Sequence, residues 1–457
     1  MKKIELLAPA GDIEKLKAAV DYGADAVYFG GKTGSLRAAA GNLSVPEIYE
    51  GVQYCHQRGK KAYLTLNIYA HNEDIEKLKS FVGSVKDSGL DAFIVSDPAV
   101  MEIVRALVPD AELHLSTQAN VTSYESAKFW YGQGIRRLIL ARELTLKEIS
   151  SIYGEIPKDM ELEIFVHGAM CISYSGRCLL SNFLADRDGN RGECAQPCRW
   201  NYELMEESNP GEYKLADESK PRKLYLEEEL RPGEYFPIEE DERGTYILNS
   251  KDLCLIRHIP ELAASGVVSA KIEGRMKSAY YVATVVRAYR KAIDEFYKDP
   301  GTYEFQECWW DELLKASHRE FTTGFFFHKA TGEDQDYLTS GYIRGMTFVG
   351  VVRGCGEEGS CGEDRLIKVE QRNKFSVGEQ LELFGADIGY HEITVTEMFD
   401  EDMNPIESAP HAQQTVYIRV NGIAAHKKTL ADNDMTISHS VDDGIAVRAG
   451  MMLRRSK

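Results

Sequence analysis

The sequence predicts an α/β fold: a (β/α)₈ barrel of the TIM type, with a cysteine-rich insertion after its seventh strand and a small all-β domain at its C-terminal end. Three observations support this prediction. The 457 residues leave room for two or three domains, or for one large barrel with an appendage. Short apolar runs alternate with amphipathic stretches over about the first 300 residues. After residue 341, Gly, Asp and Asn separate short β-like runs.

Eight strands are expected in the barrel, and most of them are uninterrupted apolar runs. This pattern is typical of strands that are buried on both faces of a parallel sheet. The strands are expected at 4–8, 26–30, 62–67, 92–96, 112–116, 137–141, 161–166 and 267–272. An open, doubly wound sheet is the structural alternative. It is less favoured, because Ala8-Pro9-Ala10-Gly11 does not fit the glycine-rich phosphate fingerprint expected after a first strand.

Helices of ordinary length are expected between these strands. The first begins at Asp12, a good N-cap, and the second has Pro46 near its first turn. The third ends before Gly89, a typical C-terminal stop. The helices are expected at 12–22, 46–58, 74–88, 123–132, 145–153, 252–264 and 276–297. Strands and helices in this order predict a barrel over residues 1–300.

A long insertion at 168–249 interrupts the regular pattern. Its first part, 168–202, is rich in Cys, Gly and Arg, whereas 203–242 carries 14 acidic and 5 basic residues. We expect the acidic part to be a solvated excursion that contains a hairpin. Residues 301–340 are expected to connect the barrel to a β-rich domain at 341–457 with a frayed basic tail. The strands of that domain are expected at 345–352, 366–370, 380–384, 393–398 and 414–420.

The composition excludes several classes of protein. Hydrophobic residues make up 43% and charged residues 28%, which argues against fibrous and disordered chains. The net charge of −18 excludes a global basic surface for nucleic acid, although a local basic patch remains open. No apolar stretch approaches the ~20 residues that span a bilayer, and the N-terminal apolar run is too short for a signal peptide. We therefore expect a cytoplasmic protein with no membrane partner.

Four of the nine cysteines lie close together in the sequence. Cys171, Cys178, Cys194 and Cys198 follow the pattern Cys-x6-Cys-x15-Cys-x3-Cys. Thiols clustered in this way indicate a metal or cluster site, directly after the C-terminal end of a barrel strand. The wide first spacing fits zinc poorly, so an iron–sulfur cluster is preferred over zinc, and four buried apolar cysteines are the less favoured alternative. Cys254 is an alternative to Cys198 as fourth ligand.

Polar residues gather at the C-terminal ends of the predicted strands, which meet at one mouth of a barrel. They are Asn67, Asp97, Ser116, Gln118, Arg142, His167, Lys271, Glu273 and Arg275. Lys271 and Glu273 share one face of the last strand, so with Arg275 they are candidates to bind a carboxylate or phosphate, or to form an ion pair that closes the rim. His167 is a candidate general base, a cluster neighbour or a structural histidine. The sequence contains no serine nucleophile elbow, no His-Glu-x-x-His zinc helix and no phosphate-binding loop, so no protease mechanism is recognisable.

These motifs resemble the peptidase U32 family, also called collagenase-like proteases. The resemblance rests on Glu163-x-Phe165-x-x-Gly168-Ala169-Met170-Cys171 and on Gly176-x-Cys178-x-Leu180-Ser181. It extends to Leu7-Ala8-Pro9-Ala10-Gly11, Gly23-Ala24-Asp25-Ala26-Val27-Tyr28 and Lys271-Ile272-Glu273-Gly274-Arg275. The resemblance covers about residues 4–330, and the β-rich tail is similar to the family's C-terminal domain.

The family name implies proteolysis of unassigned mechanism, but several branches of the family imply hydroxylation supported by a 4Fe–4S cluster. One branch makes 5-hydroxyuridine at the wobble position of tRNA, with prephenate as hydroxyl source. Another branch hydroxylates a quinone precursor as a two-protein complex, and a third modifies a cytidine of ribosomal RNA. Cys171, Cys178 and Cys194 match the first three cluster ligands of the family, and Cys198-Arg199-Trp200 is similar to the tRNA branch.

The resemblance therefore implies a tRNA uridine hydroxylase with a small carboxylate co-substrate, and we take His167, Lys271, Glu273 and Arg275 as its candidate catalytic residues. The acidic chain would need a local basic face for tRNA. The candidates for that face are Lys271, Arg275, Lys277, Arg287, Arg290 and Lys291, and an ordinary solvated helix face is the alternative. A collagenase-like peptidase and an iron–sulfur partner subunit of a hydroxylase complex are the alternatives.

Overall fold

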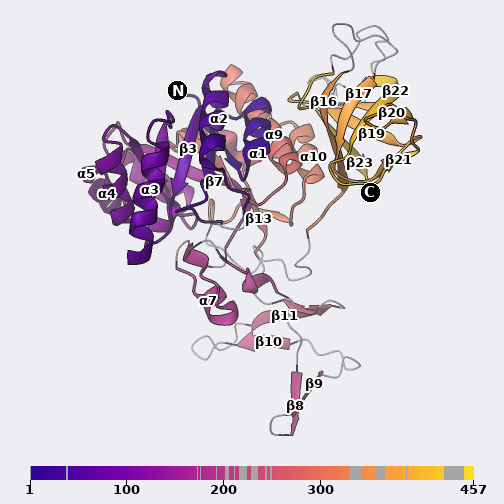
Figure 1. Cartoon of the computed structure of the whole chain (residues 1–457). Coiled ribbons are helices and arrows are strands. Elements are labelled where there is room, and N and C mark those ends of the chain that lie inside the picture. The colour runs from indigo at the N-terminus through magenta and orange to yellow at the C-terminus, as the bar shows by residue number, and fades with distance from the viewer. Residues whose placement is uncertain are drawn as a thin grey trace.

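The computed structural model (Figure 1) contains a parallel barrel, an insertion and a second, antiparallel barrel. It describes residues 2–200 except 38–39, 172, 175–176 and 192, strand residues between 205 and 246, and 250–328. It also describes 342–355, 366–426 except 388, and 447–457.

Eight parallel strands form the first barrel, as predicted. They are β1 (Glu5–Ala10), β2 (Ala26–Gly30), β3 (Lys61–Leu66), β4 (Ala92–Val95), β5 (Glu112–Leu115), β6 (Arg137–Ile139), β7 (Glu161–Ala169) and β14 (Ser269–Ile272). They pair in the order β14-β1-β2-β3-β4-β5-β6-β7, and pairing between β14 and β7 closes the ring. Their apolar side chains belong to one large buried core.

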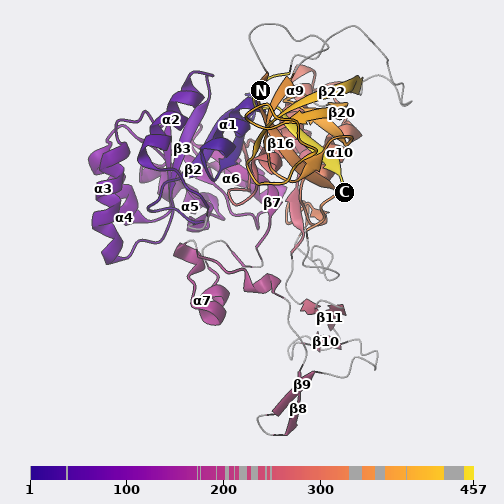
Figure 2. The same cartoon turned by 45° about the vertical axis from the view of Figure 1, so that its right-hand side comes forward.

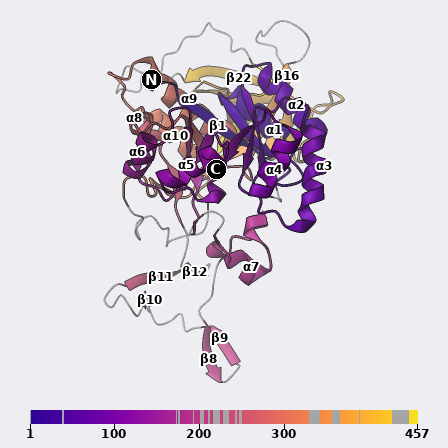
Figure 3. The ribbon, with the colours of Figure 1, turned by 90° about the vertical axis from the view of Figure 1, so that its left-hand side faces the viewer.

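Helices lie outside the barrel strands (Figure 3). They are α1 (Ile13–Asp21), α2 (Val45–His56), α3 (Ile75–Val85), α4 (Pro98–Leu107), α5 (Tyr124–Gly132), α6 (Leu146–Glu155), α8 (Ile259–Ala264) and α9 (Ala279–Lys298), with short 3₁₀ turns at Asn72–Asp74, Thr117–Ala119 and Ile256–His258. The Asp12 carboxylate accepts the Lys15 N–H and caps α1, as its position in the sequence predicts.

Two helix predictions need correction. Helix α4 was not predicted, although Asp97 caps it and Pro98 begins it. The helix expected at 252–264 is wrong at its start, because Asp252–Cys254 is a strand, β13, that pairs antiparallel with the end of β7. The exit from the insertion thereby extends the sheet beyond the barrel, and β15 (Phe321–Thr322) adds to it in parallel.

The described elements of the insertion lie beyond the C-terminal ends of the strands, away from the barrel body (Figures 1 and 2). Its first part holds α7 (Leu180–Ala185) and 3₁₀ turns at Gly189–Arg191 and Pro197–Arg199. The predicted hairpin is present as β8 (Met205–Asn209) and β9 (Glu212–Leu215), which pair antiparallel. A second small sheet comprises β10 (Leu224–Glu227), β11 (Tyr235–Asp241) and β12 (Gly244–Tyr246). The other residues of the predicted acidic excursion lie outside the described residues.

The β-rich region forms a closed antiparallel barrel with its own core. Its strands, in order around the barrel, are β16 (Met346–Cys355), β17 (Leu366–Gln371), β22 (Thr415–His426), β20 (Tyr390–Phe399), β19 (Gln380–Phe384) and β23 (Met452–Ser456). A short pair, β18 (Phe375–Ser376) and β21 (Ser408–Ala409), lies beside it. The prediction of a frayed tail is wrong, because β23 pairs with both β16 and β19 and closes this barrel.

The two barrels meet at a buried interface. Within the segment expected only to connect them, α10 (Glu307–Lys315) packs on α9. Glu312 of α10 accepts hydrogen bonds from Arg287 of α9 and from Arg454 of β23, and both arginines are fully buried. The Tyr22 hydroxyl donates to the Gly450 carbonyl at 3.0 Å. Residues 329–340 of the predicted connection lie outside the described residues.

Within the described parts of the chain, no helix is long and apolar enough to cross a membrane.

Candidate active site at the barrel mouth

A charged layer fills the barrel interior beneath the mouth. Arg137 of β6 reaches Glu5 of β1 at 2.5 Å, although these strands are not neighbours, so the two side chains meet inside the barrel. Arg137 also contacts Glu163 of β7 at 3.4 Å, and the Tyr63 hydroxyl donates to Glu5 at 2.9 Å. Buried charges of this kind need partners. The charged residues of this layer therefore hold one another in fixed positions.

Lys271 belongs to this interior layer. Its ammonium donates to Glu163 at 2.9 Å and lies 4.3 Å from the centre of the Tyr28 ring. Burial lowers the pKa of Lys271, although Glu163 opposes this. Burial alone would raise the pKa of Glu163, but Lys271 and Arg137 hold it below its ordinary value. Lys271 thus pairs with Glu163 from the neighbouring strand, and not with Glu273 as one alternative from the sequence proposed.

Glu273 lies one layer higher, at the mouth itself. Its carboxylate contacts Arg37 at 3.3 Å and accepts a hydrogen bond from the Tyr28 hydroxyl at 3.4 Å. Burial would raise the pKa of Glu273, but Arg37, and then Arg142 and Arg275, hold it low. Glu273 is therefore an ionised carboxylate between arginines.

Arg275 is buried and holds the loop after β2 in place. It donates to Ser35 Oγ at 2.7 Å, to Asn42 Oδ1 at 2.7 Å and to Thr65 Oγ1 at 3.1 Å. These acceptors are neutral, and burial lowers the pKa of Arg275 to about 10. Arg275 therefore positions the loop that carries Arg37.

Glycines make room for the loop that bears Glu273 and Arg275. A Cβ on Gly11 would lie 2.1 Å from the Arg275 carbonyl oxygen, and a Cβ on Gly168 would lie 2.6 Å from that of Glu273. Gly168 also has a φ of +108°, a region that side chains rarely adopt. The glycines at the ends of β1 and β7 thus allow this close approach.

His167 does not point into the mouth. The pairing of β7 with β14 shifts register between Phe165 and His167, as at a β-bulge, so His167 faces outward while Phe165 packs near Lys271 in the interior. The ring of His167 contacts Tyr281, Tyr289 and Phe321, and its Nδ1 lies 3.4 Å from the Tyr289 hydroxyl. Burial lowers the pKa of His167 to about 3.

The remaining predicted mouth residues mostly support local structure. The Asn67 side chain accepts a hydrogen bond from the Leu36 N–H at 3.2 Å and donates one to the Ser116 hydroxyl at 3.3 Å. Asp97 caps α4, and the Gln118 carbonyl accepts the Tyr69 hydroxyl. Sequence reasoning did not find Arg37, because its loop shows no distinctive spacing. Tyr28 ends one of the motifs that carry the family resemblance, but the motif does not mark it as a site residue. Contact with Glu273 identifies both.

The candidate cluster cysteines follow β7 directly. None of the four is in a disulfide; Cys171 and Cys194 are exposed, and Cys178 and Cys198 are partly buried. Arg142 donates to the Ala169 carbonyl at 2.7 Å and to Cys171 Sγ at 3.7 Å. The Gln196 N–H donates to Cys194 Sγ at 3.4 Å.

The donor set fits an iron–sulfur cluster by its chemistry. Thiolates hold such clusters, and N–H groups directed at the sulfurs tune them. In the described residues, no three His, Cys, Asp or Glu side chains already converge as in a metal site. Cys254 is buried on β13 near Tyr289, and burial raises the pKa of its thiol to about 12. Because ligands bind as thiolates, this environment favours Cys198 over Cys254 as fourth ligand.

The predicted basic face for tRNA is wrong. Lys271, Arg275 and Arg287 are buried. Arg290 pairs with Asp25 and Asp294, and Lys291 pairs with Asp387. Lys277 is partly buried, and its ammonium lies 3.6 Å from the centre of the Tyr342 ring. The six residues therefore form no continuous positive surface.

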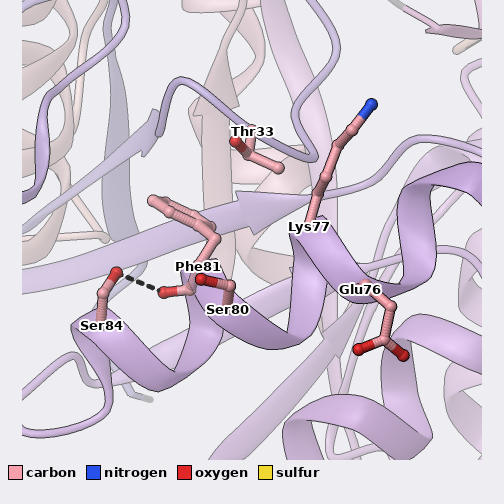
Figure 4. A pocket seen from close by; sticks show the side chains of 6 residues that line it. All are labelled: Thr33, Glu76, Lys77, Ser80, Phe81 and Ser84. Carbon is pink, nitrogen blue, oxygen red and sulfur yellow. Dashed lines mark hydrogen bonds between the residues drawn. The ribbon is translucent and has the colours of Figure 1, made fainter.

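A shallow hollow lies elsewhere, between the loop after β2 and helix α3 (Figure 4). Its lining includes Thr33, Lys77 and Phe81, and the Ser84 hydroxyl donates to the Phe81 carbonyl at 2.7 Å. It contains none of the predicted site residues, so the mouth remains the candidate site.

Comparisons with known proteins agree with this architecture. Residues 11–336 match the model of peptidase family U32, and residues 344–431 match the model of the peptidase family U32 C-terminal domain. The tRNA hydroxylation protein P1 of Bacillus subtilis is 40% identical over 420 residues, which cover 92% of each chain. The tRNA hydroxylation protein P of Escherichia coli is 39% identical over 442 residues, 92% of this chain and 94% of that one. A protein named collagenase from Porphyromonas gingivalis is 32% identical over 76% of this chain and 79% of its own. The chain belongs to peptidase family U32.

Proposed function

We propose that this protein is an RNA-modifying hydroxylase that acts on tRNA. The observation that carries the proposal is the similarity to tRNA hydroxylation proteins, at about 40% identity over nine-tenths of the chain. This similarity spans both barrels and the cysteine segment together. More specifically, we propose that the product is 5-hydroxyuridine at the wobble position.

The mouth supports an anionic co-substrate, for which we propose a small carboxylate similar to prephenate. Arg37 and Arg142 border the mouth beside the carboxylate of Glu273. Guanidinium groups bind carboxylates through paired hydrogen bonds. In this arrangement Glu273 orients Arg37, Arg275 holds the loop in place, and Lys271, paired with Glu163, lies in the layer beneath the substrate.

We further propose that Cys171, Cys178, Cys194 and Cys198 hold one 4Fe–4S cluster. When bound, the cluster would supply redox or Lewis-acid chemistry next to the mouth. Arg142 would then hold the Cys171 sulfur in position, because it donates to this sulfur and also to the Ala169 carbonyl. Through this pair of contacts, a residue that follows β6 holds both the end of β7 and the first residue of the cysteine segment.

The test is tRNA nucleoside analysis in a strain that lacks the gene and carries either the wild type or Cys171→Ala. The wild type should restore 5-hydroxyuridine, and anaerobically purified protein should contain about four iron and four sulfide per chain. Cys171→Ala should lose both. Cys308→Ala is the matched control, since this cysteine lies in α10 and should leave both unchanged. Normal modification by Cys171→Ala would refute the cluster assignment.

A peptidase activity is the second candidate, and the collagenase relative favours it. It predicts that metal-free protein cleaves denatured collagen. The hydroxylase proposal predicts no cleavage by the same preparation. A third candidate, an iron–sulfur partner subunit, predicts a stable complex with a second protein and no modification by this protein alone.

A further inference from the structure

The part of the insertion that carries the cysteines exposes an unusual set of side chains. Five of the fifteen large hydrophobic side chains exposed in the described residues lie between residues 174 and 200. They are Tyr174, Leu179, Phe183, Leu184 and Trp200. Phe183 is 83% exposed and Leu179 is 69% exposed. Single exposed apolar side chains are ordinary, but their concentration in so short a segment points to contact with a partner.

The basic residues of the same segment are all arginines. Residues 171–200 contain four arginines, no lysine and three acidic residues, a net charge of 4 − 3 = +1 in a chain of −18. Arginine and aromatic side chains share a planar face that stacks on nucleobases. Phosphate contacts by lysine are the more general way to hold a nucleic acid backbone, and the basic face expected for this purpose is absent from α9 and its surroundings.

Hydrogen bonds connect the C-terminal end of this cysteine-bearing segment to α7. The Ala195 N–H donates to Ser181 Oγ at 2.9 Å, and the Trp200 indole donates to the Ala195 carbonyl at 3.1 Å. Trp200 is therefore connected through Ala195 to α7, the helix that carries Phe183. The segment begins at Cys171, which Arg142 fixes at the mouth, and Figures 1 and 3 show α7 beyond the barrel on the side where the insertion emerges.

We propose that Tyr174, Phe183 and Trp200 form a stacking platform for unpaired bases of the substrate RNA. This inference rests on the proposed function and names how the RNA is recognised. An unpaired loop offers base faces that a duplex hides. Bases next to the target nucleotide would stack on the platform, and Arg177 and Arg187 would contact these bases or their phosphates. The platform would thus select RNA loops over duplexes beside the mouth.

The test measures RNA affinity of anaerobically prepared holoenzyme by fluorescence anisotropy. The probes are an RNA hairpin whose loop carries the target uridine and a fully paired duplex of equal length. Wild type should bind the hairpin more tightly than the duplex. Phe183→Ala and Trp200→Ala should each weaken hairpin binding roughly tenfold and leave duplex binding unchanged. Phe129→Ala is the matched control, since Phe129 is 60% exposed but lies on α5, and it should bind as the wild type does.

Two further measurements separate stacking from folding. Phe183→Leu keeps an apolar side chain without an aromatic face and should lose affinity, whereas Phe183→Trp should retain it; equal binding by both would overturn the proposal. In wild-type protein, 4-thiouridine in the hairpin loop should crosslink to the peptide 171–200. Crosslinks only elsewhere would overturn the platform even if the variants fail to fold.

The remaining outcomes are also decisive. If sedimentation shows a wild-type dimer that Phe183→Ala dissociates, the platform binds a second copy and not RNA. If the wild type restores 5-hydroxyuridine in cells but these variants bind RNA normally, only the platform fails. If the wild type modifies no tRNA, the proposed function itself fails.

Discussion

At the scale of single residues, the structure separates two kinds of predicted site residue. Glu273 lies at the mouth with arginines around it, as its position after the last strand predicts. His167 lies on the outer side of β7, because the register shift at Val166 changes the face of the next residue. A simple alternation along β7 would put Glu163, Phe165 and His167 on one face. A sequence shows this alternation but not a bulge, so the sequence could not predict the position of His167.

The buried position of His167 leads to a prediction about stability and pH. Its pKa is about 3 in the folded protein, against 6.5 ordinarily. Between these values the unfolded chain binds a proton that the folded chain excludes, so stability is lost as pH falls, by up to about 1.4 kcal/mol per pH unit. His167→Gln should reduce this slope between pH 6.5 and pH 4 in urea unfolding. Burial also lowers the pKa of His114, so part of the slope should remain.

The matched control for this prediction is His56→Gln, a surface histidine of α2 that contacts Asp91. The slope of this variant should remain steeper than that of His167→Gln. An unchanged slope in His167→Gln would contradict the assignment of His167 as a buried, neutral side chain.

At the scale of elements, apolar runs predicted the barrel strands well because each is buried on both faces. The observed strands overlap all eight predicted ranges. Local patterns predicted less well where a longer-range contact decides the structure. Asp252–Cys254 continues an amphipathic pattern, yet it forms a strand because it pairs with the last residues of β7, at His167, Gly168 and Ala169. Similarly, the sequence motifs contain Gly11 and Gly168, but the sequence does not show that the loop with Glu273 and Arg275 packs against them.

Those glycines give a prediction at this scale. Gly168→Ala should destabilise the protein by about 1–3 kcal/mol and reduce tRNA modification, because the new Cβ would strike the backbone of Glu273 and the backbone φ is positive. Thermal unfolding and nucleoside analysis measure the two effects. Gly83→Ala is the control: this glycine lies within α3 with nothing within 4 Å of its added Cβ. It should stabilise the protein by up to about 1 kcal/mol. If Gly168→Ala is as stable and active as Gly83→Ala, the close approach is not required.

At the scale of the whole molecule, composition and periodicity predicted two units but not how they join. The last residues, Arg448 to Lys457, read as a short basic tail because charge and the chain end both suggest fraying. In the structure the positive charge of this segment stabilises an ordered strand. Arg454 reaches across the interface to Glu312 while its strand completes the second barrel. The partner lies about 140 residues away in the sequence, so no local pattern could reveal the pair.

This interface gives the last prediction. Arg454 donates to Glu312 at 2.6 and 3.1 Å and to Glu382 at 2.7 Å, and it is fully buried. Arg454→Met removes the cation but leaves Glu382 and Glu312 in place, with Arg287 still beside Glu312. Breaking a buried pair on one side costs about 3–5 kcal/mol, so calorimetry should show a lower melting temperature, with the two barrels unfolding in separate steps. The next residue in β23 provides the control: Arg455 is about one-third exposed and pairs with Glu379, and Arg455→Met should cost at most about 1 kcal/mol. Equal losses in the two variants would mean that β23 pairing alone, and not the buried arginine, joins the barrels.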